Sequence, residues 1–185
     1  MSDKPTWILI AAAVVAGGAI VAVIAYYIAR FLRGSITLSL PRTVFNPGDT
    51  ITGSFDLLTK KPIEGNKLSV SLIGIKVTKT HRGGGHEGAT RRTHSEEIYR
   101  DELLVEEARS YQAGHTSQYE FELAVPNTSE PKFMSSALGQ TLTAALGFLS
   151  NKSTRLKWNV EAQLDAKGVD LVATKAVTIN MKRLV

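Results

Sequence analysis

Apolar and polar residues alternate with a period of two through most of the chain from Ser35 onward. In the segment SITLSL, Ile36, Leu38 and Leu40 are apolar and the residues between them are polar. Successive side chains of a strand point to opposite faces, so this alternation predicts strands with one buried face. The pattern recurs in five further segments, at 51–57, 68–78, 119–125, 156–164 and 169–181.

Three other stretches refine this strand pattern. Residues 97–108 alternate less regularly and predict a strand, with a short helix as the alternative. The apolar phase shifts near Ile73-Gly74, and one extra residue at that point predicts a β-bulge. Residues 81–94 are polar and rich in glycine, so they predict a flexible loop or the tip of a hairpin.

Several short strands separated by turns predict two antiparallel sheets packed face to face. The expected fold class is therefore an all-β, immunoglobulin-like sandwich that occupies residues 35–185. Lys175 interrupts the apolar face of the last segment, which predicts an edge position or a bulge at that residue.

An uncharged run, Trp7 to Ala29, precedes the strands and predicts one transmembrane helix. As a helix it would be roughly 34 Å long, which exceeds the thickness of a bilayer core of about 30 Å. A cleaved signal peptide is the alternative, but its apolar region is ordinarily shorter and followed by a small-residue cleavage site. Residues 1–6 would then form an N-terminal tail, and residues 30–34 a juxtamembrane linker.

Basic residues flank this run mainly on its C-terminal side, where Arg30 and Arg33 lie. The positive-inside tendency therefore predicts a single-pass membrane protein whose C-terminal domain is cytoplasmic. The spacings Ala13-x-x-x-Gly17 and Gly18-x-x-x-Ala22 would let two such helices approach closely, so a homodimer through the anchor is a further expectation.

One segment within the strand region has helical rather than strand spacing. About residues 131–150, apolar side chains recur at steps of three and four and predict a helical insertion. The helix could cap an open end of the sandwich, or it could contact the bilayer or a partner protein. The candidate contact residues are Phe133, Met134, Leu138, Leu142, Leu146 and Leu149.

Catalytic chemistry is hard to find in this sequence, so we expect no catalytic, cofactor-binding or metal-binding residues and no enzyme activity. The absence of cysteine excludes disulfides and thiolate chemistry. His81 and His86 could in principle share a metal, but the glycines around them make an ordered site costly. The net charge of +5 is spread among acids and bases, and this mixture is not typical of a nucleic-acid-binding protein.

The stretch FNPGDTITGSF resembles the opening of arrestin-like domains, with Phe45, Asp49, Ile51 and Gly53 at matching positions around the Pro47-Gly48 pair. The Pro-Gly pair also predicts a type II turn, since proline suits its second position and glycine its third. YEFELAVP and LKWNVEAQLDAKGVDLVATKAVTI resemble later strands of the same family. Within this family, the resemblance points to the sporulation-control proteins and the arrestin-related trafficking adaptors.

This resemblance implies a single arrestin-like lobe, because the chain has no room for the second sandwich of full arrestins. It implies a general adaptor role and no particular functional residues. The expected function is thus a membrane-tethered adaptor or scaffold that binds another protein. An extracytoplasmic module for adhesion or envelope structure is the alternative, and an enzyme or metal protein that uses the histidine-containing loop is a third class.

Overall fold

The computed structural model describes residues 31–82, 90–127 and 154–180, together with Gly17, Gly18, Val21, Gly139 and Gln140. Nine strands make up nearly all of the regular structure in these residues. They are β1 (Gly34–Ser39), β2 (Val44–Phe45), β3 (Thr50–Thr59), β4 (Ile63–Arg82), β5 (Thr90–Glu106), β6 (Arg109–Tyr111), β7 (Thr116–Ala124), β8 (Thr154–Ala166) and β9 (Leu171–Ile179).

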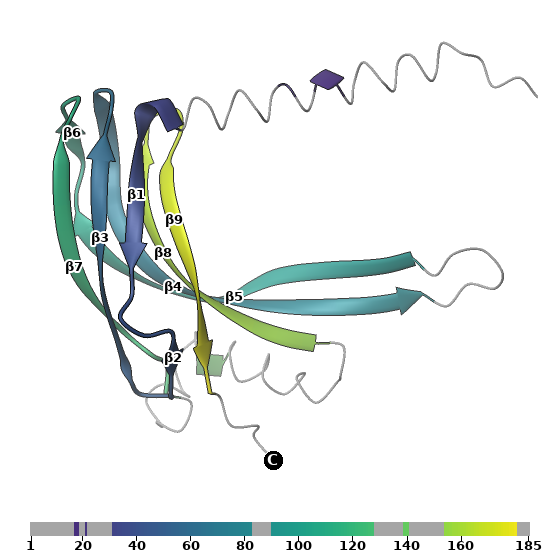
Figure 1. The fold of residues 1–185 in the computed structure, drawn as a ribbon. Helices are drawn as coiled ribbons and strands as arrows, with labels where there is room; N and C mark the ends of the chain where they lie inside the picture. Colours follow the sequence, from purple (N-terminus) through teal and green to yellow (C-terminus); the bar gives the residue numbers. More distant parts are fainter. Residues whose placement is uncertain are drawn as a thin grey trace, which may run out of the picture.

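The strands form two sheets that pack as a sandwich (Figure 1). The three-stranded sheet has the order β1-β3-β7, and the larger sheet has the order β2-β9-β8-β4-β5, with β6 paired to β4. All pairs are antiparallel except β2 with β9. The predicted all-β sandwich is therefore present in the described part of the chain.

The alternating apolar residues of the sequence line the space between the two sheets. Phe55 and Leu57 of β3 face Leu72 of β4 and Val160 of β8, and all four side chains are completely buried. Each apolar side chain of this size contributes about 1.5–3 kcal/mol when it leaves water. Burial of every second residue is thus the interaction that holds the two sheets together.

The predicted turn after β2 is confirmed by its backbone geometry. The Asp49 amide donates to the Asn46 carbonyl at 3.1 Å, and Gly48 has a φ of 83°. A glycine is also required at position 53, in β3, for a different reason. A Cβ atom there would lie 2.7 Å from Phe121 Cζ and 2.8 Å from the backbone oxygen of Ser39. The glycine therefore lets β1 and β7 approach β3 closely.

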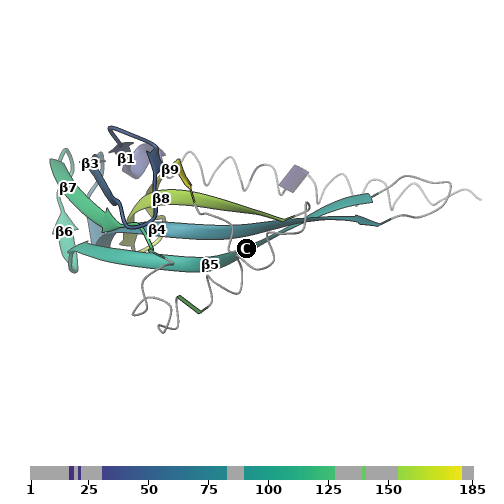
Figure 2. The ribbon, with the colours of Figure 1, turned by 90° about the horizontal axis from the view of Figure 1, so that it is seen from below.

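A long hairpin extends β4 and β5 beyond the rest of the larger sheet, and it projects away from the sandwich in two perpendicular views (Figures 1 and 2). The ladder has a register shift at the predicted place, between Gly74 and Ile75, but the extra residue is Ile98 of β5 and not a residue of β4. The pairing of β4 with β8 ends at Thr78 and Thr154, whereas its pairing with β5 continues to Arg82 and Thr90. We call the paired residues 79–82 and 90–93 the distal arm.

Two strand predictions near this hairpin are refined by the structure. The irregular stretch 97–108 is a strand through Glu106, which confirms the strand over the helix. The stretch 81–94 was predicted as a flexible loop or a hairpin tip. The hairpin alternative is supported, because residues 81–82 and 90–94 continue the ladder of β4 and β5. Cross-strand hydrogen bonds can extend a hairpin through polar residues that have no apolar face to bury, so the alternation signal failed there.

Lys175 occupies a regular position opposite Val160, so there is no bulge at that residue. Along this part of β9 the other side has no hydrogen-bonded strand in the described chain, since β2 pairs only with Thr178 and Ile179. The edge position predicted from this lysine is therefore confirmed.

The predicted fold class was wrong in adding a transmembrane helix to the sandwich. No helix among the described residues is long and apolar enough to cross a membrane. Most of 7–29 lies outside the described residues, and the helical residues 31–33 directly before β1 make less than one turn. The prediction rested on hydropathy, which measures the transfer of side chains to lipid and does not establish a continuous helix.

Candidate protein-binding surface

One side of the sandwich is formed by two strand edges that have no partner in the described chain. β7 pairs only with β3, and β5 pairs only with β4. On the opposite side β1 packs against β9, where a Cβ on Gly34 would lie 3.1 Å from Leu171 Cδ1. Unpaired edges present free backbone donors and acceptors, and an added strand can use them.

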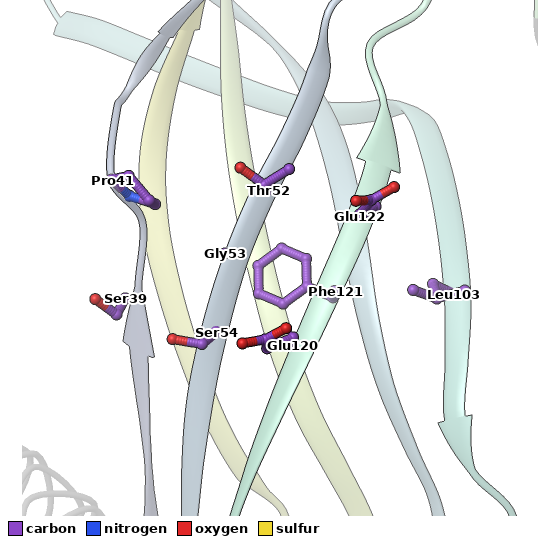
Figure 3. Close-up of a pocket in the computed structure, with 9 residues that line it drawn as sticks. All are labelled: Ser39, Pro41, Thr52, Gly53, Ser54, Leu103, Glu120, Phe121 and Glu122. Carbon is purple, nitrogen blue, oxygen red and sulfur yellow. The ribbon is translucent and has the colours of Figure 1, made fainter.

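A shallow groove of about 670 Å³ crosses the three-stranded sheet and ends at β5 (Figure 3). It is bordered by side chains from four strands or their ends, so its shape depends on the packing of both sheets. The lining residues are Ser39, Pro41, Thr52, Gly53, Ser54, Leu103, Glu120, Phe121 and Glu122.

Two of the residues that line this groove are large and apolar, Phe121 of β7 and Leu103 of β5. The Phe121 ring is 4% exposed and lies between β3 and β7, with its centroid 6.4 Å from that of Phe55 (Figure 3). Leu103 is 38% exposed, and the neighbouring Leu104 is 51% exposed. The two leucines place exposed apolar surface on an edge strand, where it can pack against an added chain.

The groove also carries negative charge. Glu120 and Glu122 are both exposed and lie two residues apart on β7, and therefore on the same face of the strand. No ion pair involves either of them within the described residues. These two carboxylates make this part of the groove electronegative.

The acidic residues on β5 differ, because most of them are paired within the chain. Lys67 Nζ lies 2.9 Å from Glu102 Oε1, and Lys76 Nζ lies 2.7 Å from Glu96 Oε2. The hydrogen bond from Lys67 lowers the pKa of Glu102 below its usual value. The negative charge of β5 is thus largely compensated, and the uncompensated charge lies on β7.

A polar cluster joins β5, β6 and β7 near the groove. The Tyr111 hydroxyl donates to Glu106 Oε2 at 2.7 Å, and Arg109 Nη1 donates to Glu106 Oε1 at 2.8 Å. Burial raises the pKa of Glu106, but hydrogen bonds from Tyr111 and Tyr119 and the charge of Arg109 outweigh it and lower the pKa. The cluster fixes β6 and β7 relative to β5, so it supports the edge strands.

The described residues offer little for catalysis. Ser117 Oγ lies 2.8 Å from His115 Nε2, but no hydrogen bond joins the other ring nitrogen to a carboxylate in the described chain. No group of three metal-ligating side chains occurs there either. His86 and the His81 side chain lie outside the described residues, so the metal hypothesis for this pair stays a prediction.

The contact residues predicted from the sequence lie elsewhere in the chain. Phe133, Met134, Leu138, Leu142, Leu146 and Leu149 are all outside the described residues, as is Arg30. Arg33 is described and has a structural role, since its Nη1 donates to the Val169 carbonyl at 3.2 Å. Gly139 and Gln140 are the described residues of the helical insertion, and both are helical.

Sequence reasoning did not single out the groove residues as a site. Leu103 lies in the irregular stretch 97–108, and Glu120 and Glu122 look like the ordinary polar face of an alternating strand. The adjacent Leu103-Leu104 pair was the available signal, because two consecutive leucines in a strand cannot both face the core.

Comparison with known proteins supports the fold. No family model and no curated protein matches the sequence. The structure is similar to the crystal structure of Spo0M, a sporulation control protein from Bacillus subtilis, with a TM-score of 0.50 and 12% identity. The match covers 81% of this chain and 50% of Spo0M, so the chain spans about half of that protein's length. The chain has an arrestin-like β-sandwich fold.

Proposed function

We propose that this chain is an adaptor module that binds an extended, basic segment of another protein along its β5–β7 side. The observation that carries this proposal is the groove in which exposed Leu103 lies with Glu120 and Glu122, beside two strand edges. Within the described residues the two glutamates form no ion pair and the two edges have no further strand. Membrane tethering is not part of the proposal.

Strand addition accounts for the arrangement of this surface. Backbone groups of an edge strand supply hydrogen bonds to an added peptide, and side-chain pockets between the strands supply specificity. An apolar side chain of the peptide would pack on exposed Leu103, and Lys or Arg side chains would lie next to Glu120 and Glu122. The arrestin-like fold is consistent with an adaptor role, as is the sporulation-control role of Spo0M.

Site-specific photocrosslinking tests the proposal. A photoreactive phenylalanine analogue at Leu103 in the full chain is expected to capture a partner, whereas the same analogue at exposed Thr174 of β9 is not. The captured partner is then purified, and its affinity is measured for the parent chain and for the variant Glu120→Lys/Glu122→Lys. The double charge reversal is expected to weaken binding about tenfold, the change that corresponds to about 1.4 kcal/mol.

A matched variant controls for the general effect of charge. Glu64→Lys/Glu107→Lys changes the net charge equally at two exposed residues that do not line the groove, and it is expected to leave the affinity unchanged. Equal capture from Leu103 and Thr174, or equal weakening by both double variants, would contradict the proposal.

A further inference from the structure

Four basic residues from three turns meet at one end of the sandwich, at the end opposite β2 (Figure 1). Arg33 precedes β1, Lys60 and Lys61 follow β3, and Lys167 follows β8. We propose that this end of the sandwich binds an anionic lipid surface. We call Phe31, Leu32 and these four residues the basic end.

Hydrogen bonds from the backbone and from one side chain hold the three turns together. The amides of Lys60 and Lys61 donate to the Arg33 carbonyl at 2.7 and 3.3 Å. The Arg33 side chain donates to the carbonyl of Val169 in the turn that follows β8. The turns therefore have a fixed arrangement, and the basic side chains are presented together although they lie far apart in the sequence.

The basic end also exposes large apolar side chains. Phe31 is 67% exposed and Leu32 is 45% exposed. The Nζ atom of Lys60 lies 3.5 Å from the centroid of the Phe31 ring. Apolar side chains bordered by lysines suit the boundary between lipid headgroups and acyl chains, since lysine can keep its charge in water while its alkyl stem is buried.

Acidic residues do not neutralise this charge. Asp170 accepts hydrogen bonds from the Ala166 amide at 3.1 Å and from Gln163 Nε2 at 3.0 Å, so it stabilises the turn after β8. Glu64 lies nearby, and it lines the same cavity as Arg33 and Lys167. No ion pair among the described residues involves Arg33 or any of the three lysines, so their positive charge is not compensated by direct pairing.

The combination of side chains favours a lipid surface over other anionic partners. Three of the four cations are lysines, which bind phosphate as compact point charges rather than through bidentate pairing. A nucleic acid backbone would use the charges but would gain little from Leu32. A basic residue near an anionic membrane surface contributes enough attraction to raise binding several-fold, and the effect falls with salt.

A fluorescent label can locate the contact, because the chain has no cysteine of its own. Gln112 is exposed in the turn beside Arg33 and Lys167, whereas Thr43 is exposed near β2 at the opposite end. Each is replaced in the full chain, as Gln112→Cys or Thr43→Cys, and labelled with a polarity-sensitive fluorophore. Phosphatidylcholine vesicles containing phosphatidylserine are expected to shift the emission of the Gln112 label to the blue. The Thr43 label is not expected to shift, and high salt should reverse the change.

Charge-reversal variants complete the test. Lys60→Glu/Lys61→Glu/Lys167→Glu is expected to reduce the salt-dependent shift and to weaken binding to anionic vesicles roughly a hundredfold. Lys79→Glu/Lys157→Glu/Lys175→Glu makes the same change in net charge away from the basic end and should have a much smaller effect. An equal shift with pure phosphatidylcholine, an equal shift at Thr43, or equal weakening by both triple variants would overturn the proposal. Each of these results can be obtained whether or not the analogue at Leu103 captures a partner, so the lipid proposal and the adaptor proposal can fail separately.

Discussion

At the scale of single residues, Glu106 shows how a charged group can stabilise an all-β domain. Its two carboxylate oxygens accept hydrogen bonds from Tyr111 and Arg109, which belong to β6. Burial and the bond to Glu106 raise the pKa of Tyr111 above its ordinary value, so the tyrosine stays a donor. Hydrogen bonds to charged groups contribute about 1.5–3 kcal/mol each.

The lowered pKa of Glu106 predicts a dependence of stability on pH. Because this pKa is lower in the folded than in the unfolded chain, the stabilisation is present above the unfolded value of about 4.3. It is lost as the pH falls from that value through the folded pKa. Glu106→Gln should therefore lower the free energy of unfolding by about 1–3 kcal/mol at neutral pH, and less at acidic pH.

Urea denaturation of parent and variant between neutral and acidic pH measures this difference. Glu107→Gln is the matched control, since the neighbouring Glu107 is exposed and should change stability little. A Glu106→Gln variant that loses the same free energy at every pH would show that the carboxylate charge is not the cause.

At the scale of elements, the β4–β5 hairpin consists of two parts with different surroundings. Between Leu68 and Gly74, β4 is paired on both sides, and every residue of this stretch is buried. In the distal arm, residues 79–82 and 90–93 pair only with each other in the described chain. An isolated two-stranded ribbon is marginally stable in water, so the arm adds little to the free energy of folding.

Removal of the distal arm should accordingly preserve the sandwich. In the variant, Asn-Gly replaces residues 79–93 and joins Thr78 to His94, which form a pair in the ladder. Asn-Gly suits the two-residue type I′ turn that connects antiparallel strands. The free energy of unfolding by urea is expected to change by less than about 1 kcal/mol. A large loss of stability would mean that the arm packs against another part of the chain.

At the scale of the whole molecule, β2 links distant parts of the chain. It lies parallel to the end of β9, and the Asn180 amide donates to the Phe45 carbonyl at 2.9 Å. The Phe45 ring is 1% exposed, whereas the adjacent Val44 is 54% exposed. One short strand thus closes the end of the sandwich opposite the basic end, mainly through one buried ring.

Phe45→Ala is therefore expected to lower the free energy of unfolding by about 3–5 kcal/mol, the usual cost of removing a buried aromatic ring. Val44→Ala should cost less than about 0.5 kcal/mol, because this side chain is already half in water. Thermal or urea unfolding of the two variants makes the comparison. If both variants lost a similar amount of unfolding free energy, the buried Phe45 ring would not be the main interaction that holds β2 on the sandwich.

Much of the fold could be predicted from the sequence, because each strand signal is local. Alternation identified the strands that contain Ile36, Phe55 and Trp158, whereas the phase shift marked the position of the irregularity beside Gly74 but not the strand that carries the extra residue, Ile98 of β5. The ends of β4 and β5 could not be predicted, since residues 81–82 and 90–94 extend the hairpin without an apolar face. The transmembrane helix was wrongly added because hydropathy alone was taken to establish a spanning helix.

The sequence by itself determined which side chains face the core, where the Pro47-Gly48 turn lies and that the body is all-β, because these properties depend on neighbouring residues. Only the tertiary structure decided that Leu103 lines the same groove as Glu120 and Glu122, and that Lys60, Lys61 and Lys167 gather around Arg33. Strand order and the meeting of turns depend on pairings between distant segments. Many such pairings are compatible with the same alternating pattern, and packing of the complete core selects one of them.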